Sequence, residues 1–170
     1  KSIAVYGASA TDSRKLGNSL LKNAAGGAGD VIAVHPEARA IDGVPAVAKL
    51  DRPIDLALIS VPNNRVEAAV ADAAAAGAGT AIVLSSGFGE TGPEGRAVQD
   101  RLVAIARSAG IRLVGPNCMG VVSYLGENRW LNGSYFWSIP TVAGGLSFIS
   151  QSGAFGGMFF GHMRASGLGL

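Results

Sequence analysis

The opening segment constrains the fold more than any other part of the sequence. An apolar run at residues 2–6 leads through mostly small and hydroxylated residues at 7–13 into two cations and then into a helical pattern. A strand that turns directly into a helix exposes unpaired backbone N–H groups, and the helix dipole adds positive charge at the same end. This arrangement predicts an anion site. The residues that we expect to bind the anion are Gly7, Ala8, Ser9, Arg14 and Lys15.

The same segment departs from two well-known phosphate-binding motifs. The dinucleotide fingerprint G-x-G-x-x-G is broken because Ser9 stands at the second glycine position and Gly17 comes too late for the third. A Walker loop is excluded because Lys15 is followed by Leu16 rather than by Ser or Thr. A plain strand-to-helix turn with no ligand therefore remains an alternative.

Strand and helix patterns alternate along most of the chain. We predict strands at 2–6, 31–34, 55–62, 80–84 and 112–114, helices at 16–24, 63–76 and 93–110, and one or two helical turns at 46–50. Apolar strands separated by helices and short loops are typical of a doubly wound parallel sheet. We therefore expect an α/β protein with a Rossmann-like sheet, whose ligands lie at the carboxyl ends of the strands.

The pattern changes after residue 120. We expect residues 121–142 to be irregular and aromatic, with Trp130, Tyr135, Phe136 and Trp137 either forming a hydrophobic seam between domains or bordering the substrate. A second strand, hydroxyl-rich loop and helix follow, with the strand at 146–149 and the helix reaching about residue 165. We predict a first domain at 1–125, a linker at 126–143 and the start of a second α/β domain at 144–170. The second predicted anion site comprises Ser150, Ser152, Gly153 and Ala154.

Composition excludes several classes of protein. The chain is 48% hydrophobic and 15% charged with a net charge of +2, and it has no basic run, so we expect no nucleic-acid partner. No apolar stretch is long enough to span a bilayer and the N-terminus has no signal pattern, so we expect a cytoplasmic protein without a membrane partner. Cys118 is the only cysteine and the two histidines are isolated, so we expect no disulfide and no metal site. We also expect the chain to be part of a longer protein.

Seven short strings occur in an order that is familiar. They are Gly-Ala-Ser at 7–9, Lys-Leu-Gly-Asn at 15–18, Val-His-Pro at 34–36, Val-Pro at 61–62, Ser-Ser-Gly-Phe-Gly-Glu-Thr-Gly at 85–92, Gly-Pro-Asn-Cys-Met-Gly at 115–120 and Ser-Gln-Ser-Gly-Ala-Phe-Gly at 150–156. With these strings the chain resembles the CoA-binding domain of the nucleoside-diphosphate-forming acyl-CoA synthetases. That group includes the ADP-forming acetyl-CoA synthetases and the succinyl-CoA synthetase alpha subunit.

The resemblance implies a role for each loop of the predicted sheet. The first loop would lie against the CoA phosphates and the loop after the second strand would face the adenosine end, with Arg39 as a candidate for the 3′-phosphate. A solvated surface arginine is the alternative for Arg39. The remaining residues that the resemblance places at the coenzyme are His35, Pro36, Val61, Pro62, Ser85, Ser86, Gly87 and Asn117. Glu90 reads as an exposed turn residue, and Cys118 as a small buried side chain rather than a nucleophile.

The second strand, loop and helix would begin a flavodoxin-like ligase domain. In the resembling enzymes this helix points its N-terminus at a phosphorylated histidine, and the loop at 150–154 would supply hydroxyl and N–H donors to that phosphate. The histidine comes later in the family pattern, and His162 lies within the helix, so we assign no catalytic residue. We therefore expect the chain by itself to be inactive.

The function that the resemblance implies is an acid–thiol ligase. It would make an acyl-CoA thioester from a carboxylic acid, CoA and ATP through acyl phosphate and phosphohistidine, using Mg²⁺, and would require an ATP-grasp domain or subunit in an oligomer. Three alternatives stay open. They are a CoA-sensing module of a protein lysine acetyltransferase, a CoA-binding protein without chemistry, and a NAD-binding domain in which Glu37 would contact the ribose.

Overall fold

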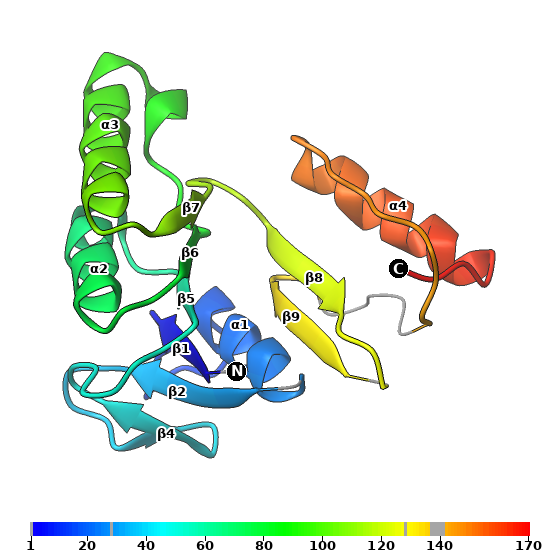
Figure 1. Cartoon of the computed structure of the whole chain (residues 1–170), viewed down its shortest axis with the longest axis horizontal. Coiled ribbons are helices and arrows are strands. Elements are labelled where there is room, and N and C mark those ends of the chain that lie inside the picture. Colours follow the sequence, from blue (N-terminus) through cyan, green and yellow to red (C-terminus); the bar gives the residue numbers. More distant parts are fainter. Residues whose placement is uncertain (1, 28, 128, 137–141) are drawn as a thin grey trace.

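The computed structural model describes residues 2–27, 29–127, 129–136 and 142–170 (Figure 1). Its main sheet contains β1 (Ser2–Tyr6), β2 (Asp30–Val34), β3 (Ala40–Ile41), β4 (Val44–Val47), β5 (Leu56–Ile59), β6 (Thr80–Val83) and β7 (Arg112–Val114). The helices are α1 (Leu16–Ala25), α2 (Asn63–Ala75), α3 (Pro93–Ser108) and α4 (Gly153–Ala165), with a short 3₁₀ helix at Gly89–Thr91. A second, two-stranded sheet pairs β8 (Gly120–Tyr124) with β9 (Trp130–Ser134).

The strand order of the main sheet is β3-β4-β2-β1-β5-β6-β7. All neighbours run parallel except β3 and β4, which form an antiparallel hairpin at one edge. The chain turns to opposite sides of β1 when it forms β2 and later β5, so the topological switch point lies between β1 and β5. The predicted Rossmann-like sheet is confirmed, and ligands of such sheets bind at this point.

The core has two parts because the sheet is covered on both faces. Ala4 and Tyr6 of β1 point into the part that α2 and α3 cover, whereas Ile3 and Val5 point into the part that α1 covers. Since β1 is buried on both faces, its sequence is a continuous apolar run rather than an alternating one. Figure 1 shows α1 on the opposite side of the sheet from α2 and α3.

Two predicted segments have a different structure. The helical turns predicted at 46–50 are wrong, because residues 44–47 form β4 and pair with the carboxyl end of β2. The irregular segment predicted at 121–142 is wrong over β8 and β9, which form an antiparallel hairpin closed by the rings of Tyr124 and Trp130, 4.9 Å apart. In both cases the bonds to a neighbouring strand stabilise the extended backbone, and local propensity does not reveal that neighbour.

In the C-terminal segment the predicted helix is confirmed, but the predicted strand before it is wrong. Residues 146–149 are not in a strand, and Ile149 is fully exposed. The backbone before them instead bonds to the end of the chain, with the Gly144 N–H donating to the Leu170 carbonyl over 2.7 Å. The predicted helix is α4, and its bounds agree with the expected end near residue 165.

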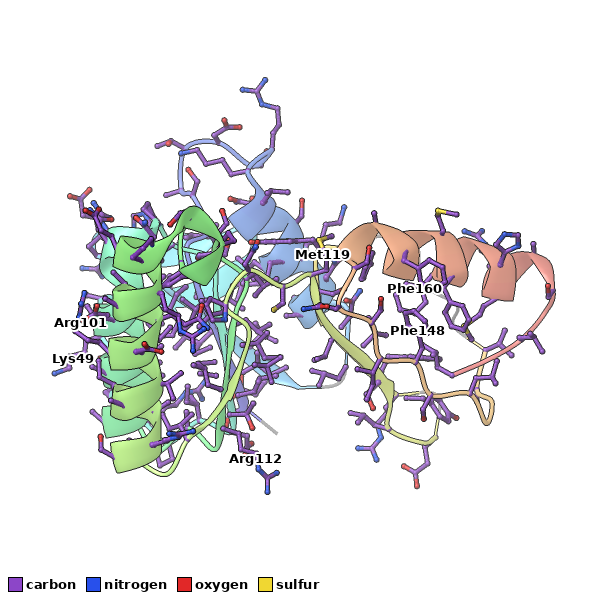
Figure 2. The ribbon with its side chains drawn as sticks, turned by 90° about the horizontal axis from the view of Figure 1, so that it is seen from above. Lys49, Arg101, Arg112, Met119, Phe148 and Phe160 are labelled. Atoms are coloured by element: carbon purple, nitrogen blue, oxygen red, sulfur yellow. The ribbon has the colours of Figure 1, made fainter. Side chains whose placement is uncertain are left out.

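The aromatic residues of the expected seam divide between several neighbours. Phe136 packs edge-on against Phe160 of α4, with ring centroids 5.0 Å apart, and Phe148 lies in the same group (Figure 2). Tyr135 packs instead against the core beside α1. Phe136 therefore packs against α4, as a seam would require, and the division into domains stays a prediction. Trp130 belongs to the hairpin, and Trp137 lies outside the described residues.

Candidate ligand-binding site

Five loops meet at the carboxyl edge of the main sheet. They are residues 7–15 after β1, 35–39 after β2, 60–62 after β5, 84–92 after β6 and 115–119 after β7. These strands are neighbours in the order β2-β1-β5-β6-β7, so the loops form one continuous row. The row contains every residue that the sequence predicted for the first site, and its centre is the switch point between β1 and β5.

Two glycines allow the backbone at the switch point to pack closely. Gly7 has a φ of +102°, and a Cβ atom there would overlap the carbonyl of Ser60 at the end of β5. A Cβ atom on Gly17, in the first turn of α1, would overlap the carbonyl of Gly7. Gly17 therefore brings α1 against the strand end, which is the usual role of the third glycine in a dinucleotide fingerprint. The sequence alone argues against Gly17 in that role, because its spacing differs from that of the standard fingerprint.

The N-terminus of α1 lies at the row of loops and has backbone N–H groups without an acceptor among the described residues. The helix has ten residues and no side-chain cap, and the carbonyl of Lys15 accepts from the amides of Asn18 and Ser19. Within the described chain, the amides of Leu16 and Gly17 donate to no protein acceptor. Free amides at the positive end of a helix attract an anion, so this end of α1 has the chemistry that the sequence predicted.

The two cations of the first loop differ in their surroundings. Arg14 forms an ion pair with Asp12 at 3.0 Å, and the hydrogen bonds from Arg14 lower the pKa of the Asp12 carboxyl below its usual value. Lys15 is exposed and has no ion-pair partner among the residues that the structure describes. Lys15 is thus the less neutralised of the two cations, since Asp12 is hydrogen-bonded to Arg14 and acts on Lys15 only through its charge.

Ser9 and Asn18 determine the shape of the first loop. The hydroxyl oxygen of Ser9 accepts from the amides of Thr11 and Asp12 at 3.3 and 3.1 Å. The Asn18 side chain is buried, and it accepts from the Ser9 amide at 2.8 Å and donates to the Ser9 carbonyl at 2.9 Å. From the sequence, Asn18 stands out only as part of the Lys-Leu-Gly-Asn string at 15–18. A polar residue in the first turn of an otherwise apolar helix face was the available signal.

The loop after β2 is closed by its histidine. The His35 Nδ1 atom accepts from the amides of Glu37 and Ala38 at 3.2 and 3.0 Å, so the ring proton of the neutral imidazole is on Nε2. Pro36 and Arg39 are exposed, and the Arg39 carbonyl accepts from the Ala46 amide of β4 at 2.8 Å. The Arg39 guanidinium forms no ion pair within the described residues, which leaves it available to an anionic ligand.

The next three loops are bonded to one another. The Ser85 hydroxyl donates to the Val61 carbonyl at 2.6 Å, and the Asn117 amide donates to the Ser85 carbonyl at 2.9 Å. Asn117 has a φ of +56°, a conformation that Asn adopts more readily than most residues. Pro62 and the Asn117 side chain are exposed at the edge, and Val61 is half-buried. The bonds give three strand ends a single rigid rim.

The Glu90 carboxylate accepts a hydrogen bond from the Gly87 amide, which the sequence predicted to contact the ligand. Its carboxylate accepts from the amides of Gly87 at 2.6 Å and Phe88 at 3.1 Å. Desolvation opposes ionisation of this carboxyl, but the amide hydrogen bonds prevail and lower its pKa below the usual value. The Gly87 amide and the Ser85 hydroxyl therefore serve the loop, and Ser86, which is exposed, has the side chain of this loop that is open to a ligand.

A half-buried group of side chains lies beside the switch point. The hydroxyl groups of Ser60 and Tyr135 are hydrogen-bonded at 2.5 Å, and burial raises the pKa of the Tyr135 phenol. The Cys118 thiol donates to the Val83 carbonyl at 3.4 Å, and burial raises its pKa. A thiol that stays protonated is a poor nucleophile, in agreement with the prediction that Cys118 is a packing residue.

The second predicted anion site lies at the start of α4. The Ser152 hydroxyl accepts from the Phe155 amide at 3.3 Å as an N-cap, and the Ser150 hydroxyl bonds the backbone of Ser152. The amides of Gly153 and Ala154 donate to none of the described residues. A Cβ atom on Gly153 would overlap the side chain of Met119, so the start of α4 lies against the loop after β7 (Figure 2).

Two further features of the described residues concern metals and membranes. No group of three or more His, Cys, Asp or Glu side chains in this part of the chain is arranged to hold a metal ion. None of its helices combines the length and the apolar character that crossing a bilayer requires.

Residues 1–124 match the family described as the CoA binding domain. Among curated proteins, the chain is 38% identical over 158 residues to the ADP-forming acetate–CoA ligase I of Archaeoglobus fulgidus, covering 91% of this chain and 22% of that protein. It is 37% identical over 162 residues to the alpha subunit of the ADP-forming acetate–CoA ligase II of Pyrococcus furiosus, covering 92% of this chain and 34% of that subunit. The chain thus spans between about a fifth and about a third of these relatives.

Solved structures are similar over the same length. A dinucleotide-forming acetyl-coenzyme A synthetase 1 of Ca. Korarchaeum cryptofilum, determined in complex with phosphate and ADP, superposes with a TM-score of 0.86 at 34% identity. The match covers 99% of this chain and 36% of that protein. The similarity therefore includes the hairpin and α4 as well as the main sheet.

Proposed function

The chain belongs to the CoA binding domain family, and from this premise we propose that the carboxyl edge of its main sheet binds coenzyme A. The observation that carries the proposal is the N-terminus of α1 at the switch point, where the amides of Leu16 and Gly17 are free and the exposed Lys15 forms no ion pair with any described residue. A diphosphate suits this site because its negative charge is stabilised both by the helix dipole and by a cation.

The remaining loops supply contacts for the rest of the coenzyme. Arg39 is our candidate for the 3′-phosphate, with Pro36 and the Nε2 side of His35 beside the adenosine. Val61 and Pro62 offer apolar surface for the pantetheine, while Ser86 and the Asn117 side chain offer hydrogen bonds to its amides. Gly7, Ala8 and Ser9 shape the diphosphate loop, and Ser85, Gly87 and the Arg14–Asp12 pair hold the adjoining backbone.

We further propose that the protein takes part in an ADP-forming acyl-CoA ligase reaction. A carboxylic acid, CoA and ATP would yield acyl-CoA, ADP and phosphate, in the cytoplasm where CoA and ATP are available. The relatives named as acetate–CoA ligases support this class of reaction. ATP and Mg²⁺ would bind an ATP-grasp domain or subunit in an oligomer, and the amides of Gly153 and Ala154 would contact a phosphate beside Met119.

Calorimetric titration of the purified chain with CoA tests the proposal. We expect saturable binding that weakens when the 3′-phosphate is removed, as in 3′-dephospho-CoA, and when Arg39 is replaced in Arg39→Ala. One lost charge-assisted contact corresponds to roughly a tenfold or greater change in affinity. Glu37→Gln is the matched control, because Glu37 is an exposed charged residue of the same loop. Binding of NAD in place of CoA would overturn the proposal.

A further inference from the structure

The side chain of Asn18 connects two parts of the proposed coenzyme site that are far apart in the sequence. Its Nδ2 group donates to the Ser9 carbonyl and to the Asp42 carboxylate, both at 2.9 Å, and its Oδ1 atom accepts from the Ser9 amide at 2.8 Å. Ser9 belongs to the loop after β1, whereas Asp42 is in the turn of the β3–β4 hairpin. One amide group therefore bridges the first loop and the edge hairpin.

The bridge has a single geometry. Asn18 is only 2% exposed, and both of its amide protons and its carbonyl oxygen have protein partners. A buried amide with every position satisfied is held in one rotamer, because any rotation leaves a polar group without a partner. The bridge therefore transmits the position of the hairpin turn to the backbone of Ser9.

The hairpin at the other end of the bridge carries Arg39. β3 has only two residues, Ala40 and Ile41, so Arg39 and Asp42 flank the same short strand. Ile41 is buried in the core part beneath α1, and the Arg39 carbonyl is bonded to the Ala46 amide. A displacement of the turn at Asp42 would therefore be passed to Arg39 through two residues of paired backbone.

We infer that Asn18 and Asp42 form a positioning pair that aligns the diphosphate loop with Arg39. This inference rests on the proposed function, because it requires that the first loop and Arg39 contact two ends of one CoA molecule. Neither Asn18 nor Asp42 contacts the coenzyme. The pair holds the two phosphate-binding elements at the spacing of the ligand before it arrives, which reduces the ordering that binding requires.

The variant Asp42→Gly tests the positioning pair, because loss of the pair and loss of the negative charge should change the affinity for CoA in opposite directions. Asp42 has a φ of +49°, which glycine adopts freely, so this change removes the carboxylate with little backbone strain. Loss of a negative charge near an anionic ligand would by itself strengthen binding. We expect instead that Asp42→Gly weakens CoA binding about threefold to tenfold, the size of one lost hydrogen bond.

Two companion variants separate the effect of the lost hydrogen bond from the effect of the lost charge and from that of replacing any exposed carboxylate by glycine. Asp42→Asn keeps an oxygen acceptor and tolerates the positive φ, so we expect it to retain affinity within about twofold of the original chain, a small fraction of a hydrogen bond. Asp51→Gly removes an exposed carboxylate of the following loop and should not weaken CoA binding. Thermal unfolding of all variants should establish that each is folded at the temperature of titration.

Titration with 3′-dephospho-CoA completes the test. Since this ligand lacks the group that we assign to Arg39, we expect Asp42→Gly to affect it less than it affects CoA. If the original chain binds CoA but Asp42→Gly behaves like Asp51→Gly, the positioning pair is refuted and the proposed function stands. Equal weakening by Asp42→Asn and Asp42→Gly, or of both ligands, would also refute it. No binding of CoA by the original chain would refute the proposed function itself.

Discussion

Gly17 packs directly against Gly7, and a Cβ atom on Gly17 would overlap the Gly7 carbonyl. The contact lies where the first strand ends and the first helix begins, so it sets the distance between α1 and the switch point. Since main-chain atoms cannot move aside as a flexible side chain can, any larger residue must push the helix away.

We therefore expect Gly17→Ala to destabilise the protein and to displace the free amides of α1. Overpacking of this kind costs about 1–3 kcal/mol, and urea unfolding should show a loss in that range together with weaker CoA binding. Gly26→Ala is the matched control at the other end of α1, where φ is −76° and the nearest atom lies 3.4 Å from the added Cβ. Equal effects of the two variants would contradict the close-packing argument.

A second prediction concerns alkaline pH. Burial, together with the hydrogen bond to the Asp72 carboxylate at 2.9 Å, raises the pKa of Tyr6 well above its ordinary value of 10.0. The folded state then keeps a proton that the unfolded state loses, so the stabilisation by Tyr6 is complete below pH 10 and is lost as the pH rises above it. We expect Tyr6→Phe to cost about 1 kcal/mol at pH 7.

The difference in free energy of unfolding between the original chain and Tyr6→Phe should shrink above pH 10. The ionisation penalty reaches about 1.4 kcal/mol per pH unit for one tyrosine, so denaturant unfolding at pH 8 to 11 should show the original chain losing its advantage over Tyr6→Phe. A constant difference across this range would contradict the assignment of the raised pKa to Tyr6.

A third prediction addresses the contact between α4 and the first domain. Gly153→Ala places a methyl group against the side chain of Met119, which lies in the loop after β7. We expect faster hydrogen exchange in α4, with a cost of about 1–2 kcal/mol for the forced displacement. Adding Met119→Ala should restore slow exchange because it vacates the space. Lack of recovery in the double variant would show that the effect of Gly153→Ala does not arise from the contact with Met119.

A fourth prediction concerns the carboxylate of Glu90. Glu90→Gln offers one acceptor oxygen in place of two, so one of the amides of Gly87 and Phe88 loses its partner. We expect faster exchange of at least one of these two amides and a change in global stability below about 1 kcal/mol, because the site is exposed. Glu94→Gln, at the start of α3, serves as the control for loss of an exposed carboxylate. Unchanged exchange at both Gly87 and Phe88 would contradict the proposed role.

Much of the main sheet could be predicted from local patterns. The apolar runs at β1, β2, β5 and β6 are continuous because both faces of the sheet are covered, and a continuous run is visible without knowing its neighbours. The loops that follow these strands could be predicted to share one edge, because the carboxyl ends of parallel strands lie together. The strand β4 and the hairpin of β8 and β9 were missed, since their extended backbone depends on pairing with partners elsewhere.

Local sequence patterns are enough to predict the α/β class, the family and the row of loops at which a ligand would bind. These follow from periodicity and from short strings, which are properties of neighbouring residues. The roles of three residues follow only from the folded chain: Gly17 sets the distance between α1 and the end of β1, Glu90 accepts from the Gly87 amide, and Asn18 joins Ser9 to Asp42. Such roles arise from distances between segments, and those distances are set by how the whole chain packs.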